Sequence, residues 1–434
     1  MSDATPRPGA RRGKARVRPP LWRKLSAGLI TGAADDDPSG IATYSQVGAA
    51  YGYGTLWSVL VALPLMIAVQ EISARIGRVT GAGVGANIRK YYAHWLAYTL
   101  VAGLVVANII NLGADIGAMG AALKLLIGGP ALAYTAAFAV LSLVLQVYVP
   151  FSWYSPFLKT LTLSLFAYVA TLFALKVPWL DVGKGVFMPH VTVSAKYAVA
   201  IVAVLGTTIS PYLFFWQAAQ EVEELREPDN DREPLKRTPS QGADALQRIR
   251  IDTVSGMVFS EVVAFSIILT AAVVLHAHGK TDIASSAQAA EALRPLAGPF
   301  AFALFAAGIV GTGLLAVPVL AGSAAYGTAD AFGKPCGLAR KPRNAKLFYS
   351  VLVIAILIGM GLNFTSIDPI RALYWSAVIN GVAAVPILVA IMLLGGNPRA
   401  MGEFVLSGWL KALGWLATAV MAAAAVIMFA TWGK

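Results

Sequence analysis

The six-residue stretch DDDPSG, residues 35–40, decides the fold of this chain. It interrupts an apolar segment whose halves are residues 25–34 and the residues from 41 onward. Each half has about ten residues, or roughly 15 Å of helix, so the break lies near the middle of a bilayer. Charged side chains at that depth are costly and generally functional. Pro38 removes a backbone donor and Gly40 tolerates unusual backbone angles, so freed carbonyls just before Asp37 can face a cation.

A second interruption, GTTISPY at residues 206–212, lies in the sixth apolar segment. A proline kink alone would explain it, because such kinks are common in transmembrane helices. Two broken segments five spans apart, however, stand at the head of two halves of five spans each. Matched segments interrupted by glycine and proline indicate an inverted-repeat transporter with its binding site between the breaks.

Around these breaks the chain has the composition of a multi-span membrane protein. Of its 434 residues, 57% are hydrophobic and 13% are charged, so lipid must be part of its solvent. A span needs about 20 apolar residues, and long runs without alternation indicate helices and not barrel strands. Eleven windows meet this condition: 24–52, 55–77, 95–121, 131–150, 157–177, 196–222, 252–276, 297–325, 346–364, 371–394 and 408–431.

The net charge of +12 does not indicate a nucleic-acid partner, because the basic residues follow the spans. Most of them lie in residues 7–24, 75–90, 226–250 and 334–346, which share one side of the membrane. This bias predicts a cytoplasmic N-terminus and an external C-terminus. Alanine- and arginine-rich usage without organelle signals favours a bacterial inner membrane, with lipid as the surrounding partner.

The predicted organisation has four parts. They are a disordered basic tail at 1–22, a first five-helix repeat at 23–180, a second at 195–395 with a flexible cytoplasmic loop at 225–250, and an eleventh helix at 405–434. No phosphate loop, zinc motif or nucleophile elbow is present, so we expect no enzyme and no cofactor besides a transported ion. The sequence carries no signal for an oligomeric state.

The two interruptions resemble motifs of the natural-resistance-associated macrophage protein (NRAMP) family of divalent transition-metal transporters. The family's Asp-Pro-Gly-Asn motif corresponds to residues 37–40, and its Ala-x-x-Met-Pro-His motif to residues 207–212. Residues 70–81, QEISARIGRVTG, resemble the family's stretch at the end of the second helix. The resemblance extends from about residue 25 through the tenth span. It implies an all-α polytopic LeuT-type fold of five plus five inverted helices, with helices 1 and 6 unwound at the midplane.

The resemblance also implies a metal site with ligands at Ala34, Asp37, Gly40, Thr207 and Ser210. Asp37 keeps the family's carboxylate, whereas Gly40 stands at the asparagine position and Ser210 at the methionine position. Loss of the only sulfur favours hard ions such as Mg²⁺ and Mn²⁺, and smaller side chains leave a wider cavity for a partly hydrated ion. The chain is similar in this to the NRAMP-related magnesium transporters, and we expect it to move Mg²⁺, and Mn²⁺ as well, by alternating access.

Proton coupling loses its usual carriers in this sequence. The family's acidic residues on the third helix correspond to Asn111 and Ala114, and its motif histidine to Tyr212, so we expect transport without protons. Asp115 lies one residue away and leaves a proton-coupled Mn²⁺/Fe²⁺ symporter open. A LeuT-fold amino-acid carrier is a further alternative, although three aspartates would repel a substrate carboxylate.

Seven residues are expected along the pathway or behind the ligands: Asp35, Asp36, Asn111, Asp115, Tyr212, Gln217 and Asn380. Three neighbouring carboxylates repel one another, so at least one of Asp35, Asp36 and Asp37 should face water or accept backbone hydrogen bonds; Asp36 is expected to line the aqueous approach. Gln217 could contact the inner pathway or bond another helix. Asn111 and Asn380 could likewise reach the site or bond neighbouring helices.

Overall fold

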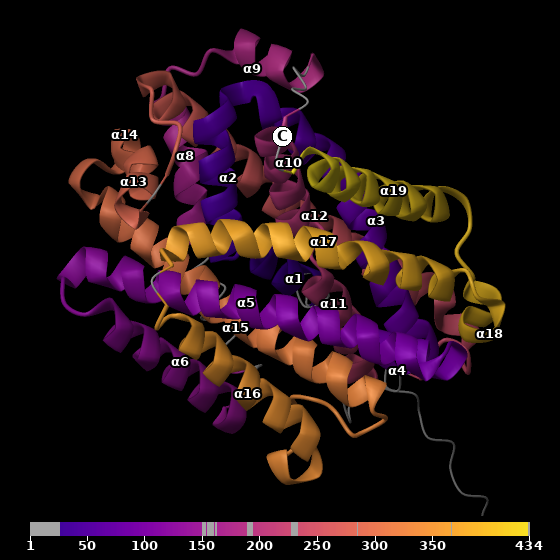
Figure 1. Cartoon of the computed structure of the whole chain (residues 1–434). Helices are drawn as coiled ribbons and strands as arrows, with labels where there is room; N and C mark the ends of the chain where they lie inside the picture. Colours follow the sequence, from indigo (N-terminus) through magenta and orange to yellow (C-terminus); the bar gives the residue numbers. More distant parts are fainter. Residues whose placement is uncertain are drawn as a thin grey trace, which may run out of the picture.

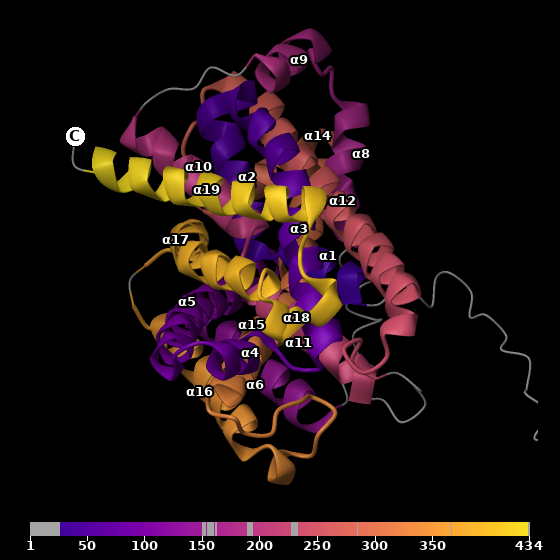
Figure 2. The same cartoon turned by 90° about the vertical axis from the view of Figure 1, so that its right-hand side faces the viewer.

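The computed structural model describes residues 27–149, 153, 160, 163–188, 194–226, 233–283, 285–365 and 367–432, which fold into helices joined by short connections (Figures 1 and 2). The longer helices are α2 (Pro38–Tyr51), α3 (Leu56–Thr80), α5 (His94–Ile127), α6 (Ala131–Tyr148), α10 (Ala195–Thr208), α11 (Pro211–Arg226), α12 (Gly242–Val274), α15 (Ala301–Ala331), α16 (Lys346–Leu362), α17 (Pro369–Gly395) and α19 (Gly408–Thr431). The shorter ones are α1 (Ala27–Asp35), α4 (Val84–Tyr91), α8 (Phe166–Ala174), α9 (Trp179–Phe187), α13 (Ser286–Ala290), α14 (Arg294–Ala297) and α18 (Pro398–Met401). The tail predicted at 1–22 lies outside the described residues.

The helices lie at the predicted windows, although fewer helical runs than windows are long and apolar enough to cross a membrane on their own. Among the described residues, eight helical runs are long and apolar enough to cross a membrane, or nine if the bent pair Leu163–Ala174 and Trp179–Phe187 is one span. The run Pro38–Thr80 joins the second half of window 24–52 to window 55–77, and α16 has only 17 residues. Part of the window 157–177 falls outside the described residues. The prediction of an all-helical membrane protein is confirmed.

The first apolar segment breaks at the predicted place but over fewer residues. α1 ends at Asp35 and α2 begins at Pro38, with Asp37 as its N-cap. Proline fits the first position of a helix because no backbone N–H is needed there, so Pro38 starts α2. Gly40 is helical, and it is not among the glycines with positive φ. The expectation that Gly40 supplies unusual backbone angles is therefore wrong.

The second break is also shorter than expected. α10 continues to Thr208 and α11 begins at Pro211, so only two residues separate them. Gly206, which we placed in the break, is helical and packs against the backbone of α17: a Cβ atom built on it would lie 2.1 Å from the carbonyl oxygen of Ala377. A side chain at this position would push the two helices apart.

The loop predicted at 225–250 is in part helical, because α12 begins at Gly242 and not near residue 252. The guanidinium of Arg248 lies 2.6 Å from a carboxylate oxygen of Glu221 and 3.2 Å from one of Glu224, both on α11. These ion pairs hold the charged first turns of α12 against α11, which the apolar pattern alone did not indicate.

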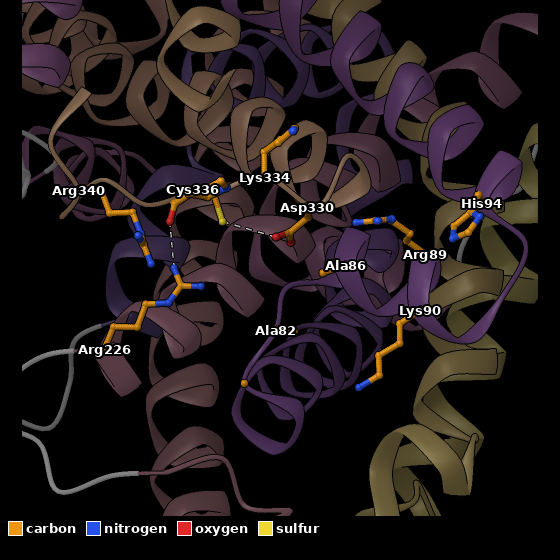
Figure 3. A pocket seen from close by; sticks show the side chains of 13 residues that line it. Ala82, Ala86, Arg89, Lys90, His94, Arg226, Asp330, Lys334, Cys336 and Arg340 are labelled. Carbon is orange, nitrogen blue, oxygen red and sulfur yellow. Dashed lines mark hydrogen bonds between the residues drawn. The ribbon is translucent and has the colours of Figure 1, made fainter. Parts of the chain in front are cut away.

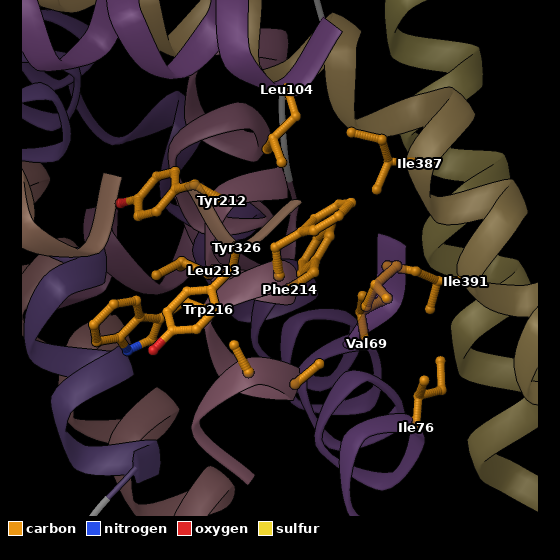
Figure 4. Packing of buried hydrophobic residues seen from close by; sticks show 14 of the residues in the cluster. Val69, Ile76, Leu104, Tyr212, Leu213, Phe214, Trp216, Tyr326, Ile387 and Ile391 are labelled. Atoms are coloured by element: carbon orange, nitrogen blue, oxygen red, sulfur yellow. The ribbon is translucent and has the colours of Figure 1, made fainter. Parts of the chain in front are cut away.

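The two breaks lie where two buried apolar clusters meet. One cluster contains Ala34 and Tyr212, and the other contains Ala33 and Tyr44. Figure 4 shows the first cluster, in which side chains of α3, α5, α11, α15 and α17 surround Phe214, while the hydroxyl of Tyr212 points away from Phe214. This packing fixes the direction in which α11 presents Tyr212 to the first break.

Candidate functional site

Asp37 is the centre of a buried hydrogen-bonded group at the first break. Its Oδ1 accepts from the hydroxyl of Ser39 at 2.6 Å and from the backbone N–H of Gly40 at 2.8 Å. Its Oδ2 accepts from the amide Nδ2 of Asn111 at 2.9 Å and from the hydroxyl of Tyr212 at 3.4 Å. Donors from α2, α5 and α11 thus fix the carboxylate, since hydrogen bonds to a charged acceptor are the strong ones.

The ends of α1 and α10 meet beside this carboxylate. The hydroxyl of Tyr212 also donates to the carbonyl oxygen of Ala34 at 3.0 Å. A Cβ atom built on Gly40 would lie 3.3 Å from the Oγ1 of Thr207 and 3.3 Å from the carbonyl oxygen of Asp35. The structure therefore brings Ala34, Gly40 and Thr207 to the same place as Asp37, as expected.

Two details of the ligand set differ from expectation. The hydroxyl of Ser210 donates to the carbonyls of Gly206 at 2.7 Å and Thr207 at 2.8 Å, so its proton is used within its own helix end. The cavity is also not widened at Gly40, because the ring of Tyr44 occupies that space: its Cε2 atom would lie 3.3 Å from a Cβ atom on Gly40. The carbonyl of Thr207 keeps a second lone pair for a cation.

Asn111 on α5 hydrogen-bonds both Asp37 and α17. Ser376 on α17 donates to its Oδ1 at 2.6 Å, which turns the Nδ2 donor toward Asp37. Asp115, one turn further along α5, is fully buried and close enough to Asp37 for their charges to interact. Within the part of the chain that the structure describes, neither oxygen of Asp115 makes a hydrogen bond of good geometry, although the backbone N–H of Ser39 is near it.

Gln217 and Asn380 differ in their hydrogen bonds to neighbouring helices. The Oε1 of Gln217 accepts from the hydroxyl of Thr31 at 2.5 Å, so Gln217 bonds α11 to α1. Asn380 on α17 is fully buried, and neither its oxygen nor its nitrogen has a hydrogen-bond partner among the described residues. The interhelical hydrogen bond considered for Asn380 is therefore not formed.

Asp35 and Asp36 face α12, and both are fully buried. The hydroxyl of Ser260 donates to the Oδ2 of Asp35 at 2.5 Å and contacts the Oδ1 of Asp36 at 3.2 Å. Asp36 does not line an aqueous approach in this structure, because the packing of α1 against α12 encloses it. Sequence reasoning missed Ser260 and Ser376, whose only signal was a small polar side chain within an apolar span.

A basic cavity of about 490 Å³ lies away from the breaks, at the ends of α4, α11 and α15 (Figure 3). Its charged lining includes Arg89, Lys90, Arg226, Lys334 and Arg340. These residues come from three segments predicted to be cytoplasmic, and the structure brings them to one cavity. Figure 3 shows the guanidinium of Arg226 at the carbonyl oxygen of Cys336, a 3.0 Å hydrogen bond.

The Cys336 thiol beside this cavity is free and buried. Burial raises its pKa to about 12, so the thiol is protonated at neutral pH.

Comparison with known proteins bears on the fold and on the family. The family model described as "Natural resistance-associated macrophage protein-like" matches residues 28–431. The divalent metal cation transporter MntH of Pectobacterium carotovorum is 29% identical over 398 residues, which are 88% of this chain and 87% of that protein.

Two solved structures share the architecture. A manganese transporter of Eremococcus coleocola, solved with an aromatic bis-isothiourea substituted compound, has a TM-score of 0.72 at 17% identity, covering 95% of this chain and 88% of its own. MhsT in complex with L-phenylalanine has a TM-score of 0.58 at 13% identity, covering 93% of this chain and 98% of its own. These likenesses confirm the predicted LeuT-type fold, and by themselves they do not choose between a metal and an amino acid.

Proposed function

The chain belongs to the natural resistance-associated macrophage protein-like family of multi-pass membrane transporters, and on that premise we propose that it moves divalent metal ions by alternating access. The observation that carries this proposal is the buried Asp37 carboxylate between two helix breaks, with the carbonyl oxygen of Ala34 beside it. One hydroxyl, that of Tyr212, touches both oxygens at once. The hydroxyl proton of Tyr212 therefore lies between the carboxylate of Asp37 and the carbonyl oxygen of Ala34, which is the position where a cation would bind.

The proposed ions are Mg²⁺ and Mn²⁺. The proposed ligands are oxygens: the carboxylate of Asp37, the carbonyls of Ala34 and Thr207, and the hydroxyl of Ser210 where the family has methionine. Hard cations prefer such ligands, and Mg²⁺ keeps several waters while using one or two carboxylates. An amino-acid substrate is disfavoured, since its carboxylate would meet Asp37.

The test is uptake of Mg²⁺, Mn²⁺ and Ca²⁺ into proteoliposomes at several pH values. We expect Mg²⁺ and Mn²⁺ uptake that Asp37→Asn abolishes. Asp244→Asn is the matched control, because Asp244 is exposed at the start of α12 and should leave uptake unchanged. Uptake of none of the three ions would refute the proposal. Ion uptake that survives Asp37→Ala would favour the alternative of an amino-acid carrier.

We propose that uptake is not coupled to protons, because Asn111 and Tyr212 stand at two of the family's titratable positions. The alternative, a proton-coupled Mn²⁺/Fe²⁺ symporter, is favoured by one observation: Asp115 is a buried carboxylate near Asp37 without a well-formed hydrogen bond. A pH-sensitive dye inside the liposomes separates the two. Acidification that accompanies Mn²⁺ entry and that Asp115→Asn abolishes would establish the symporter.

We also propose a bacterial inner-membrane location with the basic cavity on the cytoplasmic side, which follows from the positive-inside rule. Cysteine labelling from outside intact cells tests this orientation. A cysteine at the exposed position 184 or 187 in α9 should react and one at position 90 should not.

A further inference from the structure

The basic cavity at the ends of α4, α11 and α15 has an excess of positive charge. Of the described residues that line it, Asp330 alone is acidic. The lysines and arginines that line it are Arg89, Lys90, Arg226, Lys334 and Arg340. Its volume of about 490 Å³ is within the range of about 300–1,000 Å³ that is typical of ligand sites. Like charges around one space attract an anion, so the cavity suits an anionic ligand.

The Asp330 carboxylate is held by the fold and not by the basic residues. A Cβ atom built on Gly83, the residue before α4, would overlap the Oδ2 of Asp330, so this carboxylate lies against the start of α4. Its Oδ1 accepts from the thiol of Cys336 at 3.5 Å. None of the ion pairs among the described residues includes Asp330.

Most of the basic side chains at the cavity also lack a carboxylate partner. Arg226 pairs with Glu223 at 3.1 Å. The ion pairs that the described residues form do not include the others, which are Arg89, Lys90, Lys334 and Arg340. Their charges are therefore available to a ligand.

The basic groups come from three separate segments that a ligand would join. Arg89 and Lys90 lie in the last turn of α4, Arg226 in the last turn of α11, and Lys334 and Arg340 in the connection between α15 and α16. Basic residues in a last turn also suit the helix dipole, but Lys334 and Arg340 are outside any helix. In Figure 3 the guanidinium groups of Arg226 and Arg340 point toward each other. Phosphate, with several acceptor oxygens, is the anion that such arginines bind best.

Exposed aromatic side chains lie beside the cavity. Trp95 follows the lining residue His94 and is 66% exposed, and Phe332 precedes the lining residue Gly333 and is 53% exposed. The ring of Tyr98 stacks on that of Phe332, with 5.0 Å between their centroids. Tryptophan and tyrosine gather at the level of lipid headgroups. These rings therefore indicate that the cavity opens at headgroup level, where basic pockets on the cytoplasmic side bind anionic lipids.

We propose that this cavity binds a phosphate group, and that the group belongs to the headgroup of an anionic phospholipid. The unpaired Arg89, Lys334 and Arg340 donate to the phosphate oxygens. A headgroup bound there links the last turn of α11, the helix that begins at the second break, to α4 and to the connection after α15. A soluble phosphate offers the same oxygens without acyl chains. The site does not depend on which ion the chain transports.

Native mass spectrometry of the full chain in detergent tests the proposal. The probes are phosphatidylglycerol and phosphatidylcholine with the same acyl chains, which both contain a phosphate and differ in net charge. We expect phosphatidylglycerol to bind at least about tenfold more tightly. The double variant Lys334→Gln/Arg340→Gln should lose about tenfold in affinity for phosphatidylglycerol, because each basic residue near an anionic headgroup contributes severalfold. Both side chains are exposed, so the fold should be unaffected.

The matched control is the double variant Arg343→Gln/Lys346→Gln. It removes the same charge from exposed positions of the neighbouring sequence, and neither residue lines the cavity. The control should keep the affinity of the wild type. An equal loss in both double variants overturns the proposal, because it would show that the charge of the whole face attracts the lipid.

Isothermal titration with inorganic phosphate distinguishes the two sources of the phosphate group. Phosphate that binds the wild type and not Lys334→Gln/Arg340→Gln, together with equal affinities for the two lipids, would overturn the lipid and leave a site for soluble phosphate. Equal affinities for the two lipids without any binding of phosphate would overturn the site itself.

Discussion

Replacing Tyr212 by phenylalanine tests how the site stays closed without an ion. The hydroxyl donates to the carbonyl oxygen of Ala34 at 3.0 Å and contacts the Oδ2 of Asp37 at 3.4 Å. Tyr212→Phe leaves both oxygens with one donor fewer in a site closed to water. A buried group left without its partner costs about 1–3 kcal/mol. Because the longer of the two contacts is weak, we expect a cost of about 1–2 kcal/mol.

This cost falls on the ion-free state, since a bound ion satisfies the same oxygens. Tyr212→Phe should therefore bind Mn²⁺ about 5–30-fold more tightly, at about 1.4 kcal/mol per factor of ten. Isothermal titration of the detergent-solubilised chain measures the change. Tyr326→Phe is the matched control, because Tyr326 is a buried tyrosine whose hydroxyl accepts the backbone N–H of Leu338, away from the breaks. A tenfold loss of affinity in Tyr212→Phe would refute the reasoning, since it would make the hydroxyl oxygen an ion ligand.

Three further substitutions test single features of the site. Ser210→Met introduces a sulfur and should lower Mg²⁺ uptake relative to Mn²⁺ by about tenfold; an unchanged ratio in competition assays contradicts the role given to ligand hardness. Gly40→Asn must displace atoms 3.3 Å from its Cβ and should cost about 1–3 kcal/mol of stability in thermal unfolding. Gly54→Asn, with open space around it, is its control, and equal midpoints would argue against the crowding. Ser376→Ala frees the amide of Asn111 and should raise the KM for Mn²⁺ about fivefold, or about 1 kcal/mol, whereas an equal effect of Ser323→Ala would show that the loss is not specific to the site.

The breaks themselves were predictable from the sequence because proline and carboxylates act locally. Pro38 and Pro211 each stand at the first position of a helix, whereas Pro64, Pro318 and Pro386 lie inside helices, so proline indicates a break only together with its neighbours. At the first break those neighbours are three aspartates, which need a special environment in an apolar segment. The interpretation of Gly40 failed for a local reason as well. The side chain of Asp37 caps α2, so the chain turns without any unusual φ, and Gly40 is constrained by its neighbours in space.

The α12 side of the site was not predictable. Ser260 lies in an apolar window without a motif, and it meets Asp35 where Gly32 packs against Gly256 in the folded chain. The same holds for Ser376, whose contact with Asn111 depends on how α17 crosses α5. Such contacts join residues more than two hundred positions apart, as Ser260 and Asp35 show with a separation of 225.

The contact between α10 and α17 has a consequence for movement. Gly206 lies against the backbones of Ala377 and Gly381, so no side chain separates the two helices at this point. A contact between backbones does not lock the two helices in one register. One helix can therefore slide along the other at little cost, as in shear motions of packed helices. We expect α10 to travel along α17 during the transport cycle. The distance between spin labels on the outer ends of both helices would measure this displacement. A distance that does not change with Mn²⁺ would show that the two helices move as one body.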